Sequence, residues 1–138
     1  MKILGSDYDG TLTAGGIGET KISAIQKWRE SGNKFGIITG RNGNFRDELL
    51  QKYPDLKCDF FATCNGGYIT DGEGNIIFES DCNFVPISNI ATDLITLGVK
   101  FVCIISGKNL TWVVSTADDI PQYAPKEKKL FIEGYSEY

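Results

Sequence analysis

The order of apolar runs in the first forty residues constrains the fold more than any other feature of this chain. Residues 2–6 form a short apolar run, Ile22, Ile25 and Trp28 recur at helical spacing, and residues 34–39 form a second apolar run. A strand, a helix and a strand in this order predict a right-handed parallel βαβ unit. Ligands bind at the carboxyl ends of the strands in such sheets, so functional side chains are expected there.

The rest of the chain extends this unit and then departs from it. We expect a second helix at 45–53, a third strand at 59–64, an antiparallel hairpin at 68–70 and 76–78, a helix at 88–97, strands at 100–105 and 110–115, and the start of another strand at 130–132. The fold class is therefore α/β. We expect a Rossmann-like parallel sheet core over residues 1–82 and a separate block of one helix and two strands within 83–138.

Composition excludes several classes of function. The 138 residues suffice for one ordinary domain and a small module, without an apolar run of membrane-spanning length. The amino terminus lacks a secretory signal, so we expect a cytoplasmic protein with reduced thiols. A net charge of −4 argues against nucleic acid as a partner, and the absence of histidine removes Ser-His-Asp and Cys-His catalysis and histidine-ligated zinc.

The segment DYDGTLT, residues 7–13, places two carboxylates directly after the first strand. Asp7 and Asp9 suit covalent phosphoryl transfer, in which one carboxylate attacks phosphorus beside a magnesium ion and the other moves protons. Gly10 allows a sharp turn that presents amides to phosphate, and the Thr11 hydroxyl can orient the second carboxylate. The alternatives are a solvated acidic turn and a calcium loop, although the glycine comes too early for an EF-hand.

DYDGTLT resembles the first motif of the haloacid dehalogenase superfamily, whose members are mostly phosphatases. The resemblance implies that Asp7 is the nucleophile, that Asp9 is the general acid and base, and that both hold Mg²⁺. GIITGRN supplies Thr39 in the place of the second motif, as a donor to the transferring phosphoryl group. Gly40 and Arg41 follow as phosphate contacts, with a plain loop and an Arg41 paired to a surface carboxylate as the alternatives.

A third segment, CNGGYITD at residues 64–71, is similar to the Asn-Gly segment of the Cof-like branch, which carries a large α/β cap. The resemblance makes Asn65 and Gly66 candidate substrate contacts, and it implies that residues 83–138 are the beginning of an α+β cap. Simple turn chemistry is the alternative interpretation of the same residues.

Two further motifs of the superfamily, a lysine and an acidic pair, have no convincing match. Asp118 and Asp119 follow an apolar strand, with Lys100 or Lys108 upstream, but that strand belongs to an expected antiparallel hairpin. The resemblance covers residues 1–116, and such proteins are typically longer. The chain is therefore a fragment, a truncated product, or a protein that completes its sheet by forming a homo-oligomer.

The leading hypothesis is a magnesium-dependent phosphomonoester hydrolase that acts on a small phosphorylated metabolite of the sugar-phosphate type through an aspartyl phosphate on Asp7. One alternative is a weak or inactive domain that binds a phosphorylated metabolite or a protein partner. Another is a phosphomutase, because an aspartyl phosphate can be passed to a sugar instead of water.

Overall fold

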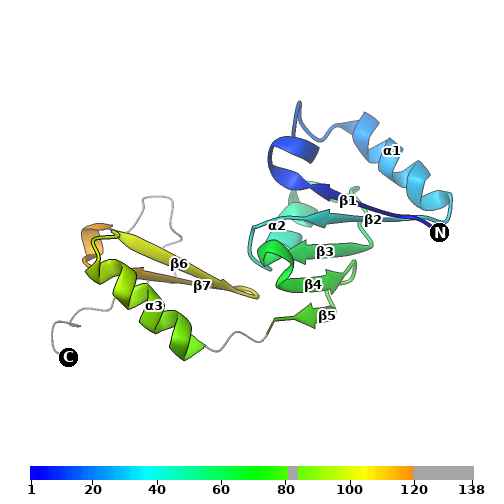
Figure 1. Ribbon diagram of the computed structural model, residues 1–138. Helices are drawn as coiled ribbons and strands as arrows, with labels where there is room; N and C mark the ends of the chain where they lie inside the picture. The colour runs from blue at the N-terminus through cyan, green and yellow to red at the C-terminus, as the bar shows by residue number, and fades with distance from the viewer. Residues whose placement is uncertain (81–83, 120–138) are drawn as a thin grey trace. The chain divides into compact units, whose positions relative to one another are not determined.

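The computed structural model describes residues 1–80 and 84–119, and these two ranges belong to two separate compact units (Figure 1). Among the described residues, no helix combines the length and the apolar character that crossing a membrane requires.

The first unit is built on one five-stranded sheet in the order β1-β2-β3-β4-β5. β1 pairs in parallel with β2 and β2 with β3, whereas β3, β4 and β5 pair antiparallel, so the predicted parallel βαβ units and the hairpin are confirmed. The elements are β1 (Ile3–Asp7), η1 (Tyr8–Leu12), α1 (Glu19–Glu30), β2 (Lys34–Ile38), α2 (Phe45–Lys52), β3 (Phe60–Thr63), η2 (Cys64–Gly66), β4 (Tyr68–Asp71) and β5 (Ile76–Glu79).

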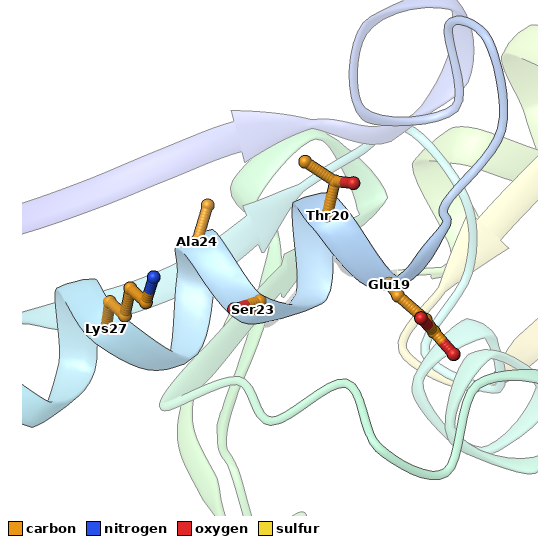
Figure 2. Close-up of a pocket in the computed structure, with 5 residues that line it drawn as sticks. All are labelled: Glu19, Thr20, Ser23, Ala24 and Lys27. Atoms are coloured by element: carbon orange, nitrogen blue, oxygen red, sulfur yellow. The ribbon is translucent and has the colours of Figure 1, made fainter.

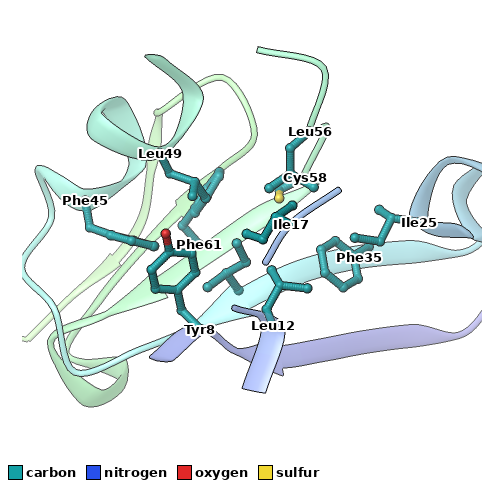
Figure 3. Packing of buried hydrophobic residues seen from close by; sticks show 11 residues of the cluster. Tyr8, Leu12, Ile17, Ile25, Phe35, Phe45, Leu49, Leu56, Cys58 and Phe61 are labelled. Carbon is teal, nitrogen blue, oxygen red and sulfur yellow. The ribbon is translucent and has the colours of Figure 1, made fainter. Parts of the chain in front are cut away.

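One face of this sheet carries the hydrophobic core (Figure 3). Phe35 and Ile37 of β2 and Phe61 of β3 are almost fully buried there. They pack in one cluster with residues of both helices, including Ile25 of α1 and Leu49 of α2. Both helices therefore cover the same face, as right-handed crossovers between strands in sequential order require.

The opposite face of the sheet has no helix of the first unit over it. The Ile38 side chain lies across Gly5 and the Phe60 ring lies across Gly36, where an added Cβ atom would come within 2.7 and 2.5 Å of them. Ile38 remains 47% exposed. A parallel sheet is normally covered on both faces, so this open face is an unusual apolar surface.

An ion-pair network ties the amino ends of two strands together, away from the carboxyl edge. Asp59 accepts hydrogen bonds from Arg29 Nε at 2.7 Å and Lys34 Nζ at 3.0 Å, and from the Phe35 amide at 3.0 Å. The hydrogen bond from Arg29 is the main cause that holds the pKa of Asp59 well below its ordinary value. This network is structural, because it joins α1, β2 and the residue before β3.

The second unit contains α3 (Phe84–Thr96), which packs on a hairpin of β6 (Phe101–Ser106) and β7 (Asn109–Val114), followed by η3 (Ala117–Asp119). The predicted helix and two strands are present, although the helix begins ahead of residue 88. Pro86 lies in its first turn, where the missing amide hydrogen does no harm. The strand expected at 130–132 lies outside the described residues.

Candidate active site

Three strands end side by side at the carboxyl edge of the parallel sheet. Asp7 is the last residue of β1 and is in register with Ile38 of β2, which in turn is in register with Ala62 of β3. The segments that follow these strands are η1, residues 39–41 and η2, and together with Asp7 itself they hold the candidate site residues from the sequence. The topology therefore brings the three motifs to one edge.

The turn after β1 presents Asp9. η1 is a single π-type turn in which Asp9 has extended backbone angles, and Gly10 has a φ of +74°, which favours glycine. The Thr13 hydroxyl accepts a hydrogen bond from the Gly10 amide at 3.0 Å and donates to the Tyr8 carbonyl at 3.1 Å. The Thr13 side chain therefore links the backbone on both sides of Asp9. Sequence reasoning did not assign it this role, although it ends the DYDGTLT segment.

Asp9 forms a two-pronged ion pair with Arg41. Arg41 Nε donates to Asp9 Oδ2 at 2.9 Å, and Arg41 Nη2 donates to Asp9 Oδ1 at 2.8 Å. These hydrogen bonds lower the pKa of Asp9, and the charge of Arg41 acts in the same direction. The carboxylate that Arg41 pairs with is therefore Asp9 itself, and Asp9 is held in its ionised form.

Aromatic rings orient the guanidinium group of Arg41. Its Cζ atom lies 5.1 Å from the centre of the Tyr8 ring and 5.3 Å from the centre of the Phe45 ring, within the range of cation–π attraction. The two rings also meet each other edge to face at 4.6 Å. Among the described contacts, the Thr11 hydroxyl makes no hydrogen bond to Asp9, so the orienting task expected of Thr11 is carried out by Arg41.

The segment after β2 is joined to the segment after β3 by backbone hydrogen bonds. The Asn65 amide donates to the Thr39 carbonyl at 3.1 Å, and the Cys64 amide donates to the Arg41 carbonyl at 2.7 Å. A Cβ atom at Gly40 would lie 3.0 Å from Asn65 Oδ1. The structure thus places Asn65 next to Gly40, although 25 positions separate them in the sequence.

The turn η2 holds a rare backbone conformation. Cys64, Asn65 and Gly66 have φ values of 52°, 54° and 92°, so three consecutive residues lie in the left-handed region. This conformation is unfavourable for a non-glycine residue such as Cys64. Backbone strain of this kind concentrates at functional sites, and here it turns the Asn-Gly segment back toward Thr39.

Comparison with known proteins identifies the family. The model of the haloacid dehalogenase-like hydrolase family matches residues 4–136. This chain is a member of that family. No protein of curated function matches the chain in sequence.

Solved structures share the fold of this family member. A haloacid dehalogenase-like hydrolase from B. subtilis aligns over 80% of this chain and 39% of its own length, with 20% identity and a TM-score of 0.67. A phosphatase of the superfamily from Bacteroides thetaiotaomicron aligns over 85% and 43%, with 23% identity and a TM-score of 0.63. A subclass IIB sugar phosphatase aligns over 82% and 44%, with 26% identity and a TM-score of 0.61. The chain thus spans about two fifths of the length of these structures.

The atoms at this edge that could bind magnesium are oxygen atoms, which suit the ion, but they are few. The exposed Asp7 carboxylate and the Asp9 main-chain carbonyl are hard oxygen donors of the type that Mg²⁺ prefers. In residues 1–80 and 84–119, no cluster of three acidic or thiol side chains is placed to hold a metal. Magnesium would therefore keep most of its water here.

The acidic pair considered in the second unit has a local role. Asp119 Oδ2 accepts hydrogen bonds from the Ser115 hydroxyl at 2.7 Å and the Thr116 hydroxyl at 2.9 Å. The preceding strand β7 pairs antiparallel with β6 and belongs to the two-stranded sheet. Asp119 thus closes a turn after a hairpin, and no parallel strand of the described chain leads to it.

A surface hollow on α1 lies outside this edge. Five residues of one helix line it: Glu19, Thr20, Ser23, Ala24 and Lys27 (Figure 2). No candidate site residue contributes to its lining, and a single helix face supplies all of its walls. We assign no chemistry to it.

Proposed function

We propose that this family member is a phosphomonoester hydrolase that uses Asp7 as the nucleophile and Asp9 as the acid and base, with magnesium. The observation that carries this proposal is the convergence of Asp7, Asp9, Thr39 and Arg41 at the carboxyl edge of one parallel sheet. Membership of a hydrolase family supports the same reaction class.

The reaction begins with attack of an Asp7 carboxylate oxygen on phosphorus, while the bond from phosphorus to the leaving oxygen breaks. Asp9 gives its proton to that oxygen, and then takes a proton from the water that attacks the aspartyl phosphate. Bound magnesium would supply positive charge that offsets the phosphoryl charge. Asp7 and the Asp9 carbonyl would hold it.

Arg41 must change partners during this cycle. A carboxylate paired with a guanidinium is a poor proton donor, because the pairing stabilises its ionised form. A phosphate group offers Arg41 another anion of matching geometry. Substrate that draws Arg41 away from Asp9 would thus restore the ordinary proton affinity of Asp9 at the time when a proton is needed.

The remaining candidate residues bind and orient the substrate in this proposal. Thr39 is 4% exposed, and its hydroxyl oxygen accepts the Arg41 amide at 3.3 Å, which leaves the hydroxyl hydrogen available for a phosphoryl oxygen. Asn65 and Gly66, beside Gly40, would contact the part of the substrate beyond the phosphate. We propose a small sugar-phosphate-type metabolite, because one solved relative is a sugar phosphatase.

A second candidate function is a domain that binds a phosphorylated metabolite or a protein with little turnover. The observation that favours it is the short donor set: no three-ligand acidic cluster stands at this edge in the part of the chain that the structure describes. The chain also spans only 39–44% of the solved structures quoted above.

Release of phosphate from a generic aryl phosphate, with magnesium and with a chelator, separates the two candidates. The hydrolase proposal expects magnesium-dependent release that Asp7→Asn abolishes and that Asp55→Asn, at an exposed position outside the site, leaves intact. A rise of specific activity with protein concentration would support a site completed between copies. Release equal to that of Asp7→Asn at every concentration would reject hydrolysis and favour the binding domain.

A further inference from the structure

A lysine at the start of α1 contacts the backbone of the segment that follows Asp9. Lys21 Nζ donates to the Leu12 carbonyl at 2.8 Å and also to the Ala14 carbonyl. Leu12 is the last residue of η1, and its side chain is buried. The ammonium group thus holds the end of the turn that presents Asp9.

Without its bonds to these two carbonyls, the positive charge of Lys21 would stand at an unfavourable place in the helix. It is the third residue of α1, and the amino end of a helix carries partial positive charge, so cations are disfavoured there. Two charge-assisted hydrogen bonds to carbonyl oxygens offset this repulsion. The Leu12 and Ala14 carbonyls accept these bonds from one ammonium group, which has three hydrogens to donate.

We propose that Lys21 is a positioning residue for Asp9. Thr13 closes η1 from inside through Tyr8 and Gly10, and Lys21 fixes its far end through Leu12 and Ala14. Asp9 lies between Tyr8 and Gly10, the two residues that the Thr13 hydroxyl bonds, and Thr13 itself lies between the two carbonyls that Lys21 bonds. Without Lys21, the far end of the turn is released, and the Asp9 carboxylate no longer meets Arg41 in one fixed geometry.

Lys21→Met is the test variant, because it keeps the aliphatic stem and removes the ammonium group. Lys21→Arg retains donors that can reach both carbonyls, and Lys27→Met removes an exposed charge from the same helix as the matched control. Hydrogen exchange of the Thr13 and Ala14 amides, which bond to Tyr8 and Thr11 within the turn, reports the turn directly. The NMR signal of the Arg41 Nε hydrogen reports the Asp9 pair.

We expect Lys21→Met to accelerate exchange of the turn amides by about 10- to 100-fold, the range for loss of hydrogen bonds to a charged group. The Arg41 signal should broaden or shift, Lys21→Arg should restore both readouts, and Lys27→Met should leave both unchanged. Three results would overturn the proposal: exchange rates of the turn amides that do not change in Lys21→Met, an equal increase in Lys27→Met, or an equal increase at the Thr39 amide, which bonds to Ala62 outside the turn.

The consequence for turnover rests on the proposed function and is measured separately. In an active protein, Lys21→Met should lower kcat for the aryl phosphate by about 10- to 100-fold with a smaller change in KM, because misplaced catalytic groups lose rate more than binding. A wild-type protein without turnover would reject the hydrolase, while the exchange and NMR readouts would still decide the role of Lys21.

Discussion

The ion pair between Asp9 and Arg41 makes a quantitative prediction about phosphate binding. If Arg41 leaves Asp9 to meet a phosphate, part of the binding free energy is spent on breaking the pair. Asp9→Asn removes that cost, because a neutral amide holds the guanidinium less strongly than a carboxylate does. A variant of a candidate catalytic residue should therefore bind inorganic phosphate more tightly than the wild-type protein.

The exposure of the pair sets the size of the effect. The Arg41 and Asp9 side chains are 47% and 55% exposed, so solvent screens their attraction. Exposed ion pairs contribute about 0.2 to 1 kcal/mol and a tenfold affinity change is about 1.4 kcal/mol, so the freed Arg41 should strengthen phosphate binding about 1.4- to 5-fold. Loss of the repulsion between Asp9 and phosphate acts in the same direction and must be separated from it.

A double-mutant cycle makes this separation. Calorimetric titration with inorganic phosphate in the presence of magnesium compares the wild-type protein, Asp9→Asn, Arg41→Met and the double variant, with Asp55→Asn as an exposed control. The gain from Asp9→Asn should be larger with Arg41 present than with Met at that position, and Arg41→Met alone should bind more weakly. Equal gains in both backgrounds, or no gain from Asp9→Asn, would refute an exchange of partners by Arg41.

Three further predictions concern stability and association. Asp59→Asn should destabilise the protein by about 2 kcal/mol. Because the pKa of Asp59 is lowered in the folded protein, the stabilisation from its carboxylate is present above about pH 4 and is lost as the pH falls. The free energy of unfolding, measured with urea between pH 5 and 2, should therefore depend less steeply on pH in the variant. Gly36→Ala should cost about 1–3 kcal/mol by thermal unfolding, because the new Cβ atom meets the Phe60 ring at 2.5 Å, and an unchanged melting temperature would contradict that packing. The open face and the unpaired edge of β1 should cause self-association in sedimentation, and Ile38→Lys should reduce it; a monomeric wild-type protein would refute this expectation.

Local patterns in the sequence were sufficient to predict the architecture of the first unit. The helical spacing of Ile22, Ile25 and Trp28 between two apolar runs specified a parallel βαβ unit, because a strand, a helix and a strand have few other stable packings. The DYDGTLT segment could be placed at a strand end for the same reason. The glycines and asparagine of residues 71–75 marked the hairpin between β4 and β5.

Contacts between distant side chains were beyond the sequence. The pair of Asp9 with Arg41 joins residues 32 positions apart, and the pattern around Arg41 fits a surface ion pair as well as a substrate contact. The left-handed backbone at Cys64 has no signature in the residue type, because cysteine does not favour that conformation. Lys21 could be recognised only after its ammonium group was seen beside two carbonyl oxygens.

The open sheet face and the pairing of Arg41 lead to one conclusion about how the site can work. Among the hydrogen bonds of the described residues, Arg41 is the cation that reaches a candidate catalytic carboxylate, so in the proposed reaction it would both hold Asp9 and bind a phosphoryl oxygen. One guanidinium cannot meet both anions fully, so the proposed turnover would require that Arg41 moves between them. Magnesium held by Asp7 would share the phosphoryl charge with Arg41. The face of the sheet next to Asp7 is open and apolar, so a partner that covers it would also have access to the carboxyl end of β1. A basic side chain from such a partner could then add positive charge at the site.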